Sequence, residues 1–293
     1  MNKYTDGVHD ISNDYYHASE GISRSGLWEF KRAPIHYWDR YLNPDREPQK
    51  TTKPMKLGEI THCAVLEPDE FKRRYARQPI YLPLPKAVRL MDVGREEFEE
   101  FKAQKESIIH TNGLTKKMFE DGLEGKETIP IAVYDECEAL SNSVWKNPVA
   151  SALFKGVEAE KSIYFTHKTG LQVKVRPDAW VGTVVTDLKT CVDASYNAFQ
   201  RVAFGKGYFL QAAMIHQALK SLGIDMEKFV FFCVEKTGVM ATVYYPLDDG
   251  ALAYGLQQFD QLMEQMAWCL ERNQWDGYES RELCLPGYAK YED

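Results

Sequence analysis

The most informative stretch of this chain is LQVKVRPDAWVGTVVTDLKT, residues 171–190. Its β-branched residues alternate with other residues on both sides of Gly182-Thr183, which predicts two strands joined by a two-residue loop. Glycine at the first loop position suits a type II′ turn, because that turn requires a positive φ there. The sequence therefore predicts a tight antiparallel hairpin whose register can be counted outward from the loop.

The predicted register places two acidic and two basic residues on one face of the hairpin. Counting outward puts Asp178 opposite Asp187, and Arg176 opposite Lys189. Opposed residues have Cβ atoms roughly 4.5–5.5 Å apart, and the two-residue period of a strand puts Lys189 on the face of Asp187. Opposed aspartates repel each other unless a cation lies between them, and Mg²⁺ prefers carboxylate and carbonyl oxygens. The pattern predicts a magnesium site beside a lysine; the alternative is a solvated hairpin with ordinary surface charges.

The composition is that of a globular protein. The chain has 293 residues and a mass of 33.7 kDa, and it is 44% hydrophobic and 27% charged, so intrinsic disorder is not expected. There is no run of roughly 18 apolar residues, and residues 1–14 are polar, which argues against a membrane-spanning helix or a secretory signal and favours the cytoplasm. The net charge of −7 disfavours non-specific coating of nucleic acid but permits a local basic groove.

The six cysteines are far apart, and none forms a C-x-x-C pair. This spacing disfavours zinc ribbons and closely spaced iron–sulfur ligands. We expect reduced and mostly buried thiols at Cys63, Cys137, Cys191, Cys233, Cys269 and Cys284.

The chain changes character at Glu160. Before it, polar stretches with prolines at 43–56 and 79–86 read as loops, and helical patterns cover 57–75, 95–107, 115–121 and 134–153. After it, the patterns predict strands at 162–166, 171–179 and 184–190, a glycine-interrupted helix at 194–222, a hairpin at 229–235 and 239–245, and a helix at 249–273. We expect an α+β protein of one domain, 1–293, with a mainly helical part, 1–159, and a β-β-β-α-β-β-α core, 160–293.

Pro177-Asp178, followed nine residues later by Asp187-Leu188-Lys189, resembles the PD-(D/E)xK nuclease signature. Three further motifs occur in the order typical of RecB-like members of that superfamily. Ser23-Arg24-Ser25-Gly26-Leu27, with Phe30 and Ala33-Pro34-Ile35-His36-Tyr37, looks like their opening helix. Leu57-Gly58, His62 and Leu66-Glu67-Pro68 resemble the histidine motif, and Tyr208 with Gln211-Ala212-Ala213 resembles the helix motif. Together the motifs span residues 15–216, and the chain is most similar to RecE-type, exonuclease VIII-like prophage exonucleases.

The resemblance implies a restriction-endonuclease-like core, in which helices flank a central mixed sheet, and it implies roles for individual residues. Asp178, Asp187, the Leu188 carbonyl and His62 would hold Mg²⁺, with Mn²⁺ as a substitute, and Glu160 would add a carboxylate. Lys189 would position the attacking water, supported by Gln211. The implied DNA-binding residues are Ser23, Arg24, Ser25, Arg73, Arg74, Arg176 and Tyr208.

Several of these residues also have plainer interpretations. Ser23 and Ser25 fit N-caps of an amphipathic helix. The basic run that contains Arg73 and Arg74 fits a solvated helix face, and a helical histidine such as His62 is commonly structural. A DNA interface is predicted only where these cations line the groove that contains Asp178.

The implied activity is Mg²⁺-dependent degradation of linear double-stranded DNA from the 5′ end, which leaves 3′ single strands for recombination. A ring-shaped homo-oligomer and a single-strand annealing partner are implied as well. The alternatives are a structure-specific endonuclease and a DNA-binding protein without catalysis. Ala33 replaces the first cluster cysteine of many relatives, so no iron–sulfur cluster is expected. Ile215 replaces their usual tyrosine, for which Tyr208 and His216 are the candidate substitutes.

Overall fold

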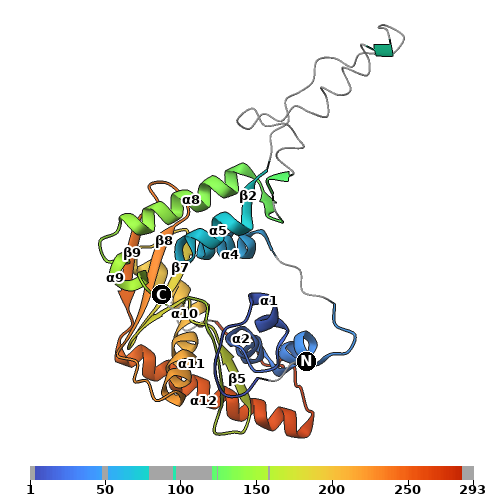
Figure 1. The fold of residues 1–293 in the computed structure, drawn as a ribbon. Helices are drawn as coiled ribbons and strands as arrows, with labels where there is room; N and C mark the ends of the chain where they lie inside the picture. The colour runs from blue at the N-terminus through green and yellow to red at the C-terminus, as the bar shows by residue number, and fades with distance from the viewer. Residues whose placement is uncertain are drawn as a thin grey trace, which may run out of the picture.

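The computed structural model describes residues 4–47, 52–78, 95–96, 121–123, 125–157 and 159–285 (Figure 1). The helices predicted over 95–107 and 115–121, and the irregular stretch 79–86, lie almost wholly outside these residues. Among the helices that are described, none combines the length and the apolar character needed to cross a membrane.

The centre of the molecule is a mixed four-stranded sheet of order β6-β7-β8-β9 (Figure 1). Its strands are β6 (Ala179–Val181), β7 (Val184–Cys191), β8 (Lys228–Glu235) and β9 (Thr242–Pro246). The β6–β7 and β8–β9 pairs are antiparallel hairpins, whereas β7 and β8 are parallel. Parallel neighbours need a long crossover, and α10 (Tyr196–Gly205) and α11 (Tyr208–Ser221) supply it.

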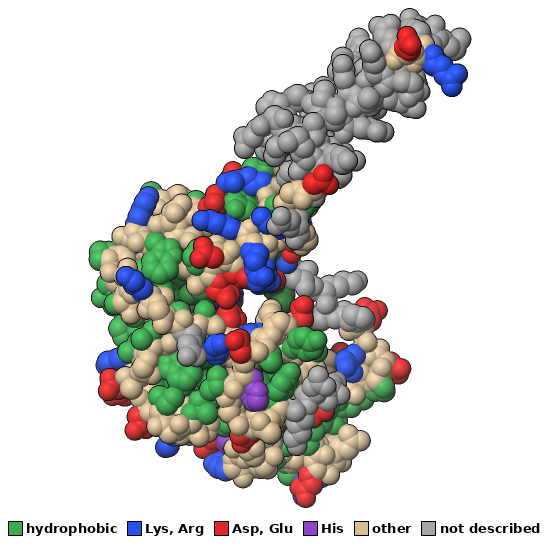
Figure 2. Space-filling view, viewed as in Figure 1, with side chains coloured by type: hydrophobic (Ala, Val, Ile, Leu, Met, Phe, Trp, Pro, Cys, Tyr) green, Lys and Arg blue, Asp and Glu red, His purple; other side chains and the backbone are tan. Residues whose placement is uncertain are grey.

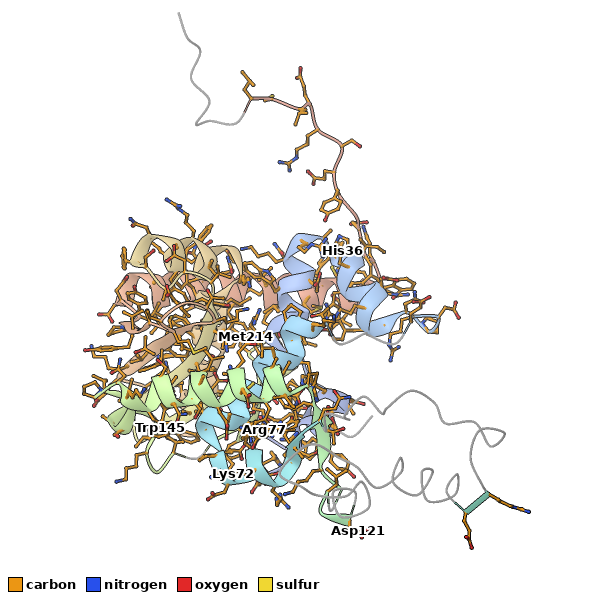
Figure 3. The ribbon with its side chains drawn as sticks, turned by 90° about the horizontal axis from the view of Figure 1, so that it is seen from above. His36, Lys72, Arg77, Asp121, Trp145 and Met214 are labelled. Carbon is orange, nitrogen blue, oxygen red and sulfur yellow. The ribbon has the colours of Figure 1, made fainter. Side chains whose placement is uncertain are left out.

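Helices cover both faces of this sheet, as the sequence predicts. On one face, α4 (Lys53–Leu66), α8 (Ile131–Lys146) and α9 (Ala150–Phe154) pack on alternate residues of the strands, including Leu188 and Phe232. Trp145 of α8 donates a hydrogen bond from Nε1 to the Val65 carbonyl at 3.1 Å, which ties α8 to α4 (Figure 3). The fold is therefore the α+β arrangement of a mixed sheet between helices.

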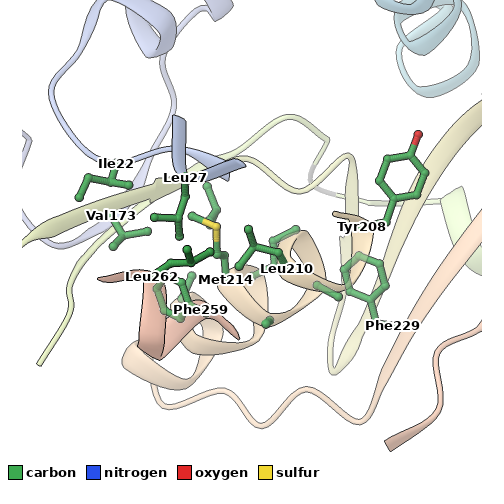
Figure 4. Close-up of a cluster of buried hydrophobic side chains, with 14 of the residues drawn as sticks. Ile22, Leu27, Val173, Tyr208, Leu210, Met214, Phe229, Phe259 and Leu262 are labelled. Carbon is green, nitrogen blue, oxygen red and sulfur yellow. The ribbon is translucent and has the colours of Figure 1, made fainter. Parts of the chain in front are cut away.

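On the opposite face, α10 and α11 lie on the sheet, and α12 (Asp249–Arg272) packs against α11. The cluster in Figure 4 joins Leu27, Val173 and Leu262 around Met214 of α11. Because side chains alternate along β7, Leu188 is buried against α8 and α9 while its neighbours Asp187 and Lys189 point toward α11.

A second sheet, of order β1-β4-β5, carries the N-terminal segment. It contains β1 (Gly7–His9), β4 (Ser162–Thr166) and β5 (Gln172–Val175), all antiparallel. Lys174 of β5 is buried, and its ammonium donates to the carbonyls of Tyr16 and Ser19 at 2.7 and 2.8 Å. These bonds satisfy carbonyls at the end of α1 (Asn13–Ala18) and fix the helix to the sheet.

The remaining elements complete the helical part of the chain. They are α2 (Arg24–Arg32), α3 (Pro34–Tyr37), the π-helical turn η1 (Trp38–Leu42), α5 (Pro68–Arg74), and the parallel strands β2 (Tyr75–Arg77) and β3 (Glu127–Ile129). Arg77 of β2 forms ion pairs with Asp135 and Glu138 of α8 at 2.8 and 2.6 Å (Figure 3). This pairing holds the short β2–β3 ribbon against α8.

The predicted hairpin at Gly182 is confirmed. Val181 pairs with Val184 and Ala179 with Thr186, as the count from the loop requires. Gly182 has a φ of +56°, which glycine adopts without steric cost. The strand at 162–166 also has the predicted ends.

Two predicted elements are wrong because a proline divides each of them. Pro68 has no N–H and begins α5, so the helix predicted over 57–75 is two helices that meet at Glu67. Pro177 similarly divides the strand predicted over 171–179 into β5 and β6, which join different sheets. The core order is therefore β-β-β-β-α-α-β-β-α.

The division at Pro177 also makes the predicted pairing of Arg176 with Lys189 wrong. The β6–β7 ladder ends at Ala179, and the Arg176 guanidinium turns toward Glu160 and the N-terminal segment instead. In the last hairpin, the predicted strand start at Val239 is also wrong: Val239 is exposed, and β9 begins at Thr242.

Candidate active site

The hairpin at Gly182 brings both aspartates into the protein interior. Asp178 lies directly before β6 and is 9% exposed, and Asp187 lies in the middle of β7 and is 1% exposed. The Asp178 Oδ2 atom accepts a hydrogen bond of 2.7 Å from the backbone N–H of Leu188, the residue after Asp187. The two aspartates therefore lie close together at the β6–β7 hairpin, although their carboxylates have different partners.

Asp178 forms a trio with His62 of α4 and Glu160, which precedes β4. One ligand atom of each residue lies within 4.8 Å of the other two, and His62 Nδ1 is 3.5 Å from Asp178 Oδ2. Two carboxylates and an imidazole are donors that Mg²⁺ and Mn²⁺ accept. Three segments far apart in the sequence therefore meet to form a set of candidate metal ligands.

The backbone of Glu160 adopts an unusual conformation. Its φ of +56° lies in the left-handed region, which costs a non-glycine residue on the order of 1–2 kcal/mol. The Glu160 N–H donates to the Asp178 carbonyl at 3.4 Å, and its carbonyl accepts from Arg176 Nε at 2.6 Å. These bonds hold the backbone in a conformation that turns the Glu160 carboxylate toward Asp178.

Protons compensate the concentrated charge of the trio. Burial and the neighbouring Asp178 raise the pKa of Glu160 to about 7. Burial opposes charging of the His62 imidazole, but Asp178 outweighs it and raises the pKa of His62 to about 9. Burial also opposes ionisation of Asp178, yet His62 and Lys189 together hold its pKa below the usual range. A trio that gains protons in this way has the electrostatic character of a cation site.

Asp187 belongs to a different group, which we call the lysine group: Asp187, Lys189, Gln211 and Tyr208. Lys189 forms an ion pair with Asp187 Oδ2, while Gln211 Nε2 donates to Asp187 Oδ1 at 2.6 Å. The Lys189 ammonium donates to Gln211 Oε1 at 3.4 Å and lies 4.6 Å from the centre of the Tyr208 ring. Burial raises the pKa of Asp187 to about 6, against the opposing effect of Lys189.

The structure thus divides the predicted site residues into two groups that share one strand pair. Asp178, His62 and Glu160 come together, whereas the Asp187 carboxylate is bound by Lys189 and Gln211 and is not part of the trio. Of the two candidates for the missing tyrosine, Tyr208 lies on Lys189, whereas His216 has Lys220 and Asp225 as its charged neighbours.

A cleft of about 1000 Å³ opens onto His62 and Glu160 of the trio, and Figure 2 shows the hollow with acidic and basic side chains at its margin. His62, Glu160 and Arg176 line one part of the cleft, and Arg73 and Arg74 of α5 line another. The predicted proximity of these two arginines to the acidic site is therefore found. Other acidic residues also line it, namely Asp10, Asp14, Glu59, Glu67, Glu70 and Glu127.

Intramolecular ion pairs already occupy the two arginines of α5. Arg73 binds Glu70 through Nε at 2.8 Å, and Arg74 Nη2 lies 3.7 Å from Glu59. A phosphate in the cleft would have to compete with these carboxylates for each guanidinium. The exposed ion pairs are weak, roughly 0–1 kcal/mol, so this competition does not prevent binding.

The predicted DNA-binding residues of the opening helix lie elsewhere. Ser23 is the N-cap of α2 and accepts a hydrogen bond from the Gly26 N–H at 3.2 Å. Ser25 lies inside α2, so its interpretation as an N-cap is wrong. Arg24 donates from Nη1 to the Lys206 carbonyl at 3.3 Å. The beginning of α2 is therefore beside the start of α11, on the side of the lysine group.

Sequence reasoning missed the part that the N-terminal segment plays at the site. Arg176 reaches the Ile11 carbonyl and, at 3.3 Å, the side-chain oxygen of Asn13, while it also binds Glu160. No local pattern reveals these contacts, because about 160 residues separate the partners in the sequence. The only local sign that such contacts exist is the arginine that stands directly before Pro177-Asp178.

Comparison with known proteins gives a consistent picture. The family model described as a PDDEXK-like domain of unknown function, DUF3799, matches residues 23–285. A crystal structure of a “Putative exonuclease” from Eubacterium rectale is similar in fold, with a TM-score of 0.59, 15% sequence identity and 96% of each chain covered. A crystal structure of SSO0001 reaches a TM-score of only 0.28 over 47% of this chain and 61% of that one, at 16% identity. No curated protein matches the chain.

Proposed function

Because the chain belongs to the DUF3799 family of PDDEXK-like domains, we propose that it is a metal-dependent nuclease that hydrolyses phosphodiester bonds of DNA. The observation that carries the proposal is the juxtaposition of the trio with Lys189. Asp178 is bonded to the Leu188 amide, and Lys189 follows that residue directly. A cation held by the trio and the lysine ammonium would thus act on neighbouring atoms of one substrate.

The donor set fits Mg²⁺ or Mn²⁺, because two of its three members are carboxylates, which these hard cations prefer as ligands. Glu160, Asp178 and His62 would hold the ion, and Asp187 with the Leu188 carbonyl would complete its surroundings from β7. When bound, such an ion polarises the scissile phosphate and lowers the pKa of a bound water.

The remaining residues of the site would orient the attacking water and stabilise the charge on the phosphate. Lys189 is held by Asp187 and Gln211, so its ammonium is fixed where it can neutralise charge on the phosphate and orient the attacking water. Relatives have a tyrosine at the position of Ile215. In this chain the Tyr208 ring, which contacts the Lys189 ammonium, would act in its stead. We assign the DNA interface to the cleft with Arg73 and Arg74, extended by Arg24 and the two serines of α2.

The finer proposal is an exonuclease on linear double-stranded DNA that proceeds from the 5′ end and leaves 3′ single strands for recombination. Its support is the RecE-type resemblance of the motifs, and the similar protein from Eubacterium rectale carries the name “Putative exonuclease”. A ring-shaped homo-oligomer and a single-strand annealing partner belong to the same proposal. We treat residues 1–293 as one catalytic domain.

Digestion of end-labelled DNA tests both levels of the proposal. Wild-type protein with Mg²⁺ is expected to shorten linear duplex and release the 5′ label first, while a covalently closed circle stays intact. Lys189→Ala is expected to lose cleavage but to keep DNA binding, which a mobility-shift assay measures. Lys228→Ala is the matched control, because Lys228 is an exposed lysine at the start of the neighbouring strand β8.

The outcomes separate the alternatives. Cleavage of the closed circle would establish a structure-specific endonuclease instead, and release of the 3′ label first would reverse the polarity. If wild-type protein binds DNA but does not cleave it in the presence of any divalent metal tested, the protein is a DNA-binding protein without catalysis. Normal cutting by Lys189→Ala would show that the role assigned to Lys189 is wrong.

A further inference from the structure

Arg176 uses every nitrogen of its guanidinium within the protein. Its side chain is 10% exposed, and Nε donates to the Glu160 carbonyl at 2.6 Å while lying 3.2 Å from Glu160 Oε2. Nη1 donates to Asn13 Oδ1 at 3.3 Å, and Nη2 donates to the Ile11 carbonyl. Both the backbone and the carboxylate of Glu160 are thus connected to the N-terminal segment through one side chain that is 10% exposed.

This connection explains how Glu160 keeps its left-handed backbone. A non-glycine residue persists at a φ of +56° only where its surroundings fix it. The carbonyl of Glu160 binds Arg176, and its N–H binds the Asp178 carbonyl, two residues after Arg176 in the chain. The same short segment therefore supplies both partners of the strained peptide and also one member of the trio.

We propose that Arg176 is a positioning residue, which uses the N-terminal segment at Ile11 and Asn13 as an anchor to hold the Glu160 carboxylate in the metal site. The inference rests on the proposed function, since it takes Glu160 as a metal ligand. It replaces the expectation that Arg176 binds DNA phosphate, because a phosphate would have to displace four protein contacts. The N-terminal segment is accordingly a structural part of the metal site.

The planar fork of arginine is required for this task. Its donors point in fixed directions, so one side chain can reach Glu160, Asn13 and Ile11 at the same time. A lysine at this position would keep the positive charge but offer a single ammonium group. Arg176→Lys therefore separates geometry from charge.

Binding of Mn²⁺, followed by electron paramagnetic resonance on the full chain without DNA, tests the proposal. We expect Arg176→Lys to weaken Mn²⁺ binding about tenfold, as the loss of residues that orient metal ligands commonly does. Asn13→Ala removes one anchor contact and leaves the others, so it should weaken Mn²⁺ binding less than Arg176→Lys does. Glu160→Gln should weaken binding at least as much as Arg176→Lys. Circular dichroism and melting curves of each variant check that the fold is kept.

Lys161→Ala is the matched control. Lys161 follows Glu160 directly and holds the same N-terminal segment through Asp10 at 2.7 Å. We expect this variant to bind Mn²⁺ as wild type does. If it weakens binding as much as Arg176→Lys, general loosening of the segment is the cause and the role of Arg176 is overturned.

Three further results would overturn the inference, and they can be told apart. If Glu160→Gln binds Mn²⁺ normally while Asp178→Asn does not, Glu160 is not a ligand and the inference fails, although the nuclease proposal stands. If the wild-type protein neither binds Mn²⁺ nor cleaves DNA, the proposed function itself fails. Normal Mn²⁺ affinity in a folded Arg176→Lys variant would show that Glu160 does not need the arginine fork.

Discussion

The trio and the lysine group lie side by side on one strand pair, but they neutralise buried carboxylate charge in different ways. In the trio, Arg176 lies 3.2 Å from the Glu160 carboxylate, but the pKa values of Glu160 and His62 stay raised, so protons supply much of the compensation. In the lysine group, a covalently fixed ammonium, that of Lys189, faces Asp187. A metal ion can replace protons bound to the trio, whereas at Asp187 it would share the carboxylate with the lysine ammonium. The trio is therefore the part of the site that exchanges protons for a metal, and Asp187 would add to the surroundings of the ion while keeping its ion pair.

The largest expected effect comes from removing the negative charge of Asp178, the carboxylate that raises the pKa of both other members of the trio. Asp178→Asn should weaken Mn²⁺ binding at least tenfold and reduce DNA cleavage on the order of 10²–10³-fold. The pKa of His62 should fall as well, because Asp178 is what raises it. Metal titration, single-turnover cleavage and histidine NMR measure the three effects.

Asp260→Asn is the control for this substitution. Asp260 also pairs with a histidine, His167, at 3.1 Å, but it lies on α12 outside the site. An equal change in Mn²⁺ affinity in Asp260→Asn and Asp178→Asn would contradict the assignment of metal binding to the trio.

The lysine group should respond to the loss of its cation in stability rather than in metal affinity. Lys189→Met leaves the buried Asp187 carboxylate without its ion pair, which should reduce the free energy of unfolding by roughly 3 kcal/mol. Asp187→Asn combined with Lys189→Met should recover most of this loss, since the charge that needed compensation is gone. Chemical denaturation of both variants measures the effect. Equal destabilisation by the single and double variants would show that packing, not charge, dominates the pair.

A smaller effect is expected at the start of α11, which carries Tyr208 and Gln211. A Cβ atom on Gly207 would lie 2.3 Å from the Trp28 ring, and Gly207 has a φ of +70°. Gly207→Ala should therefore cost about 2 kcal/mol of stability and reduce cleavage, while metal affinity remains. Gly223→Ala is the control, because its φ of +75° is similar but no atom lies within 4 Å. Equal losses in the two variants would exclude the contact with Trp28 as the cause.

The smallest expected effect is a change in the stability of the metal-free protein with pH. Glu160 and Asp187 have pKa values of about 7 and about 6, above their ordinary values. The folded protein thus binds more protons than the unfolded chain between about pH 4 and 7, so the stability of the metal-free protein falls as pH rises through this window. His62, raised to about 9, continues the fall above pH 6.5.

Metal binding should offset that loss. Because Mg²⁺ competes with these protons, the rise in melting temperature that it causes should grow from about pH 5.5 to about pH 8.5. Thermal melts with Mg²⁺ and with a chelator measure the difference. A rise of the same size at both pH values would mean that the trio does not exchange protons for metal.

The parts of the fold that the sequence predicted depend on local chemistry. The turn at Gly182 fixes its own register, and the strand predicted at 162–166 has the observed ends. The association of Lys189 with Asp187 follows from the two-residue period, and the structure confirms it. These features need no information about distant parts of the chain.

The predictions are wrong where a partner that is distant in the sequence determines the local structure. Extended residues on both sides of Pro177 looked like one strand, because nothing local shows that β5 and β6 join different sheets. The predicted partner of Arg176 was wrong for the same reason: the N-terminal segment that binds it lies far away in the sequence. Likewise, the predicted opposition of Asp178 and Asp187 lies one step beyond the observed ladder, which ends at Ala179 and Thr186. That prediction did not reveal that Asp178 would join His62 and Glu160 in a separate group.

The hydrogen bond from the Leu188 amide to Asp178 provides a natural reporter of the occupancy of the site. This amide donates to a carboxylate oxygen, Asp178 Oδ2, at a point where the ladder between β6 and β7 has already ended. An ion that withdraws electron density from that oxygen would weaken the bond without moving the strand. The ¹⁵N–¹H resonance of Leu188 should therefore shift in proportion to metal loading, so a single backbone signal could follow the chemistry of the centre in solution.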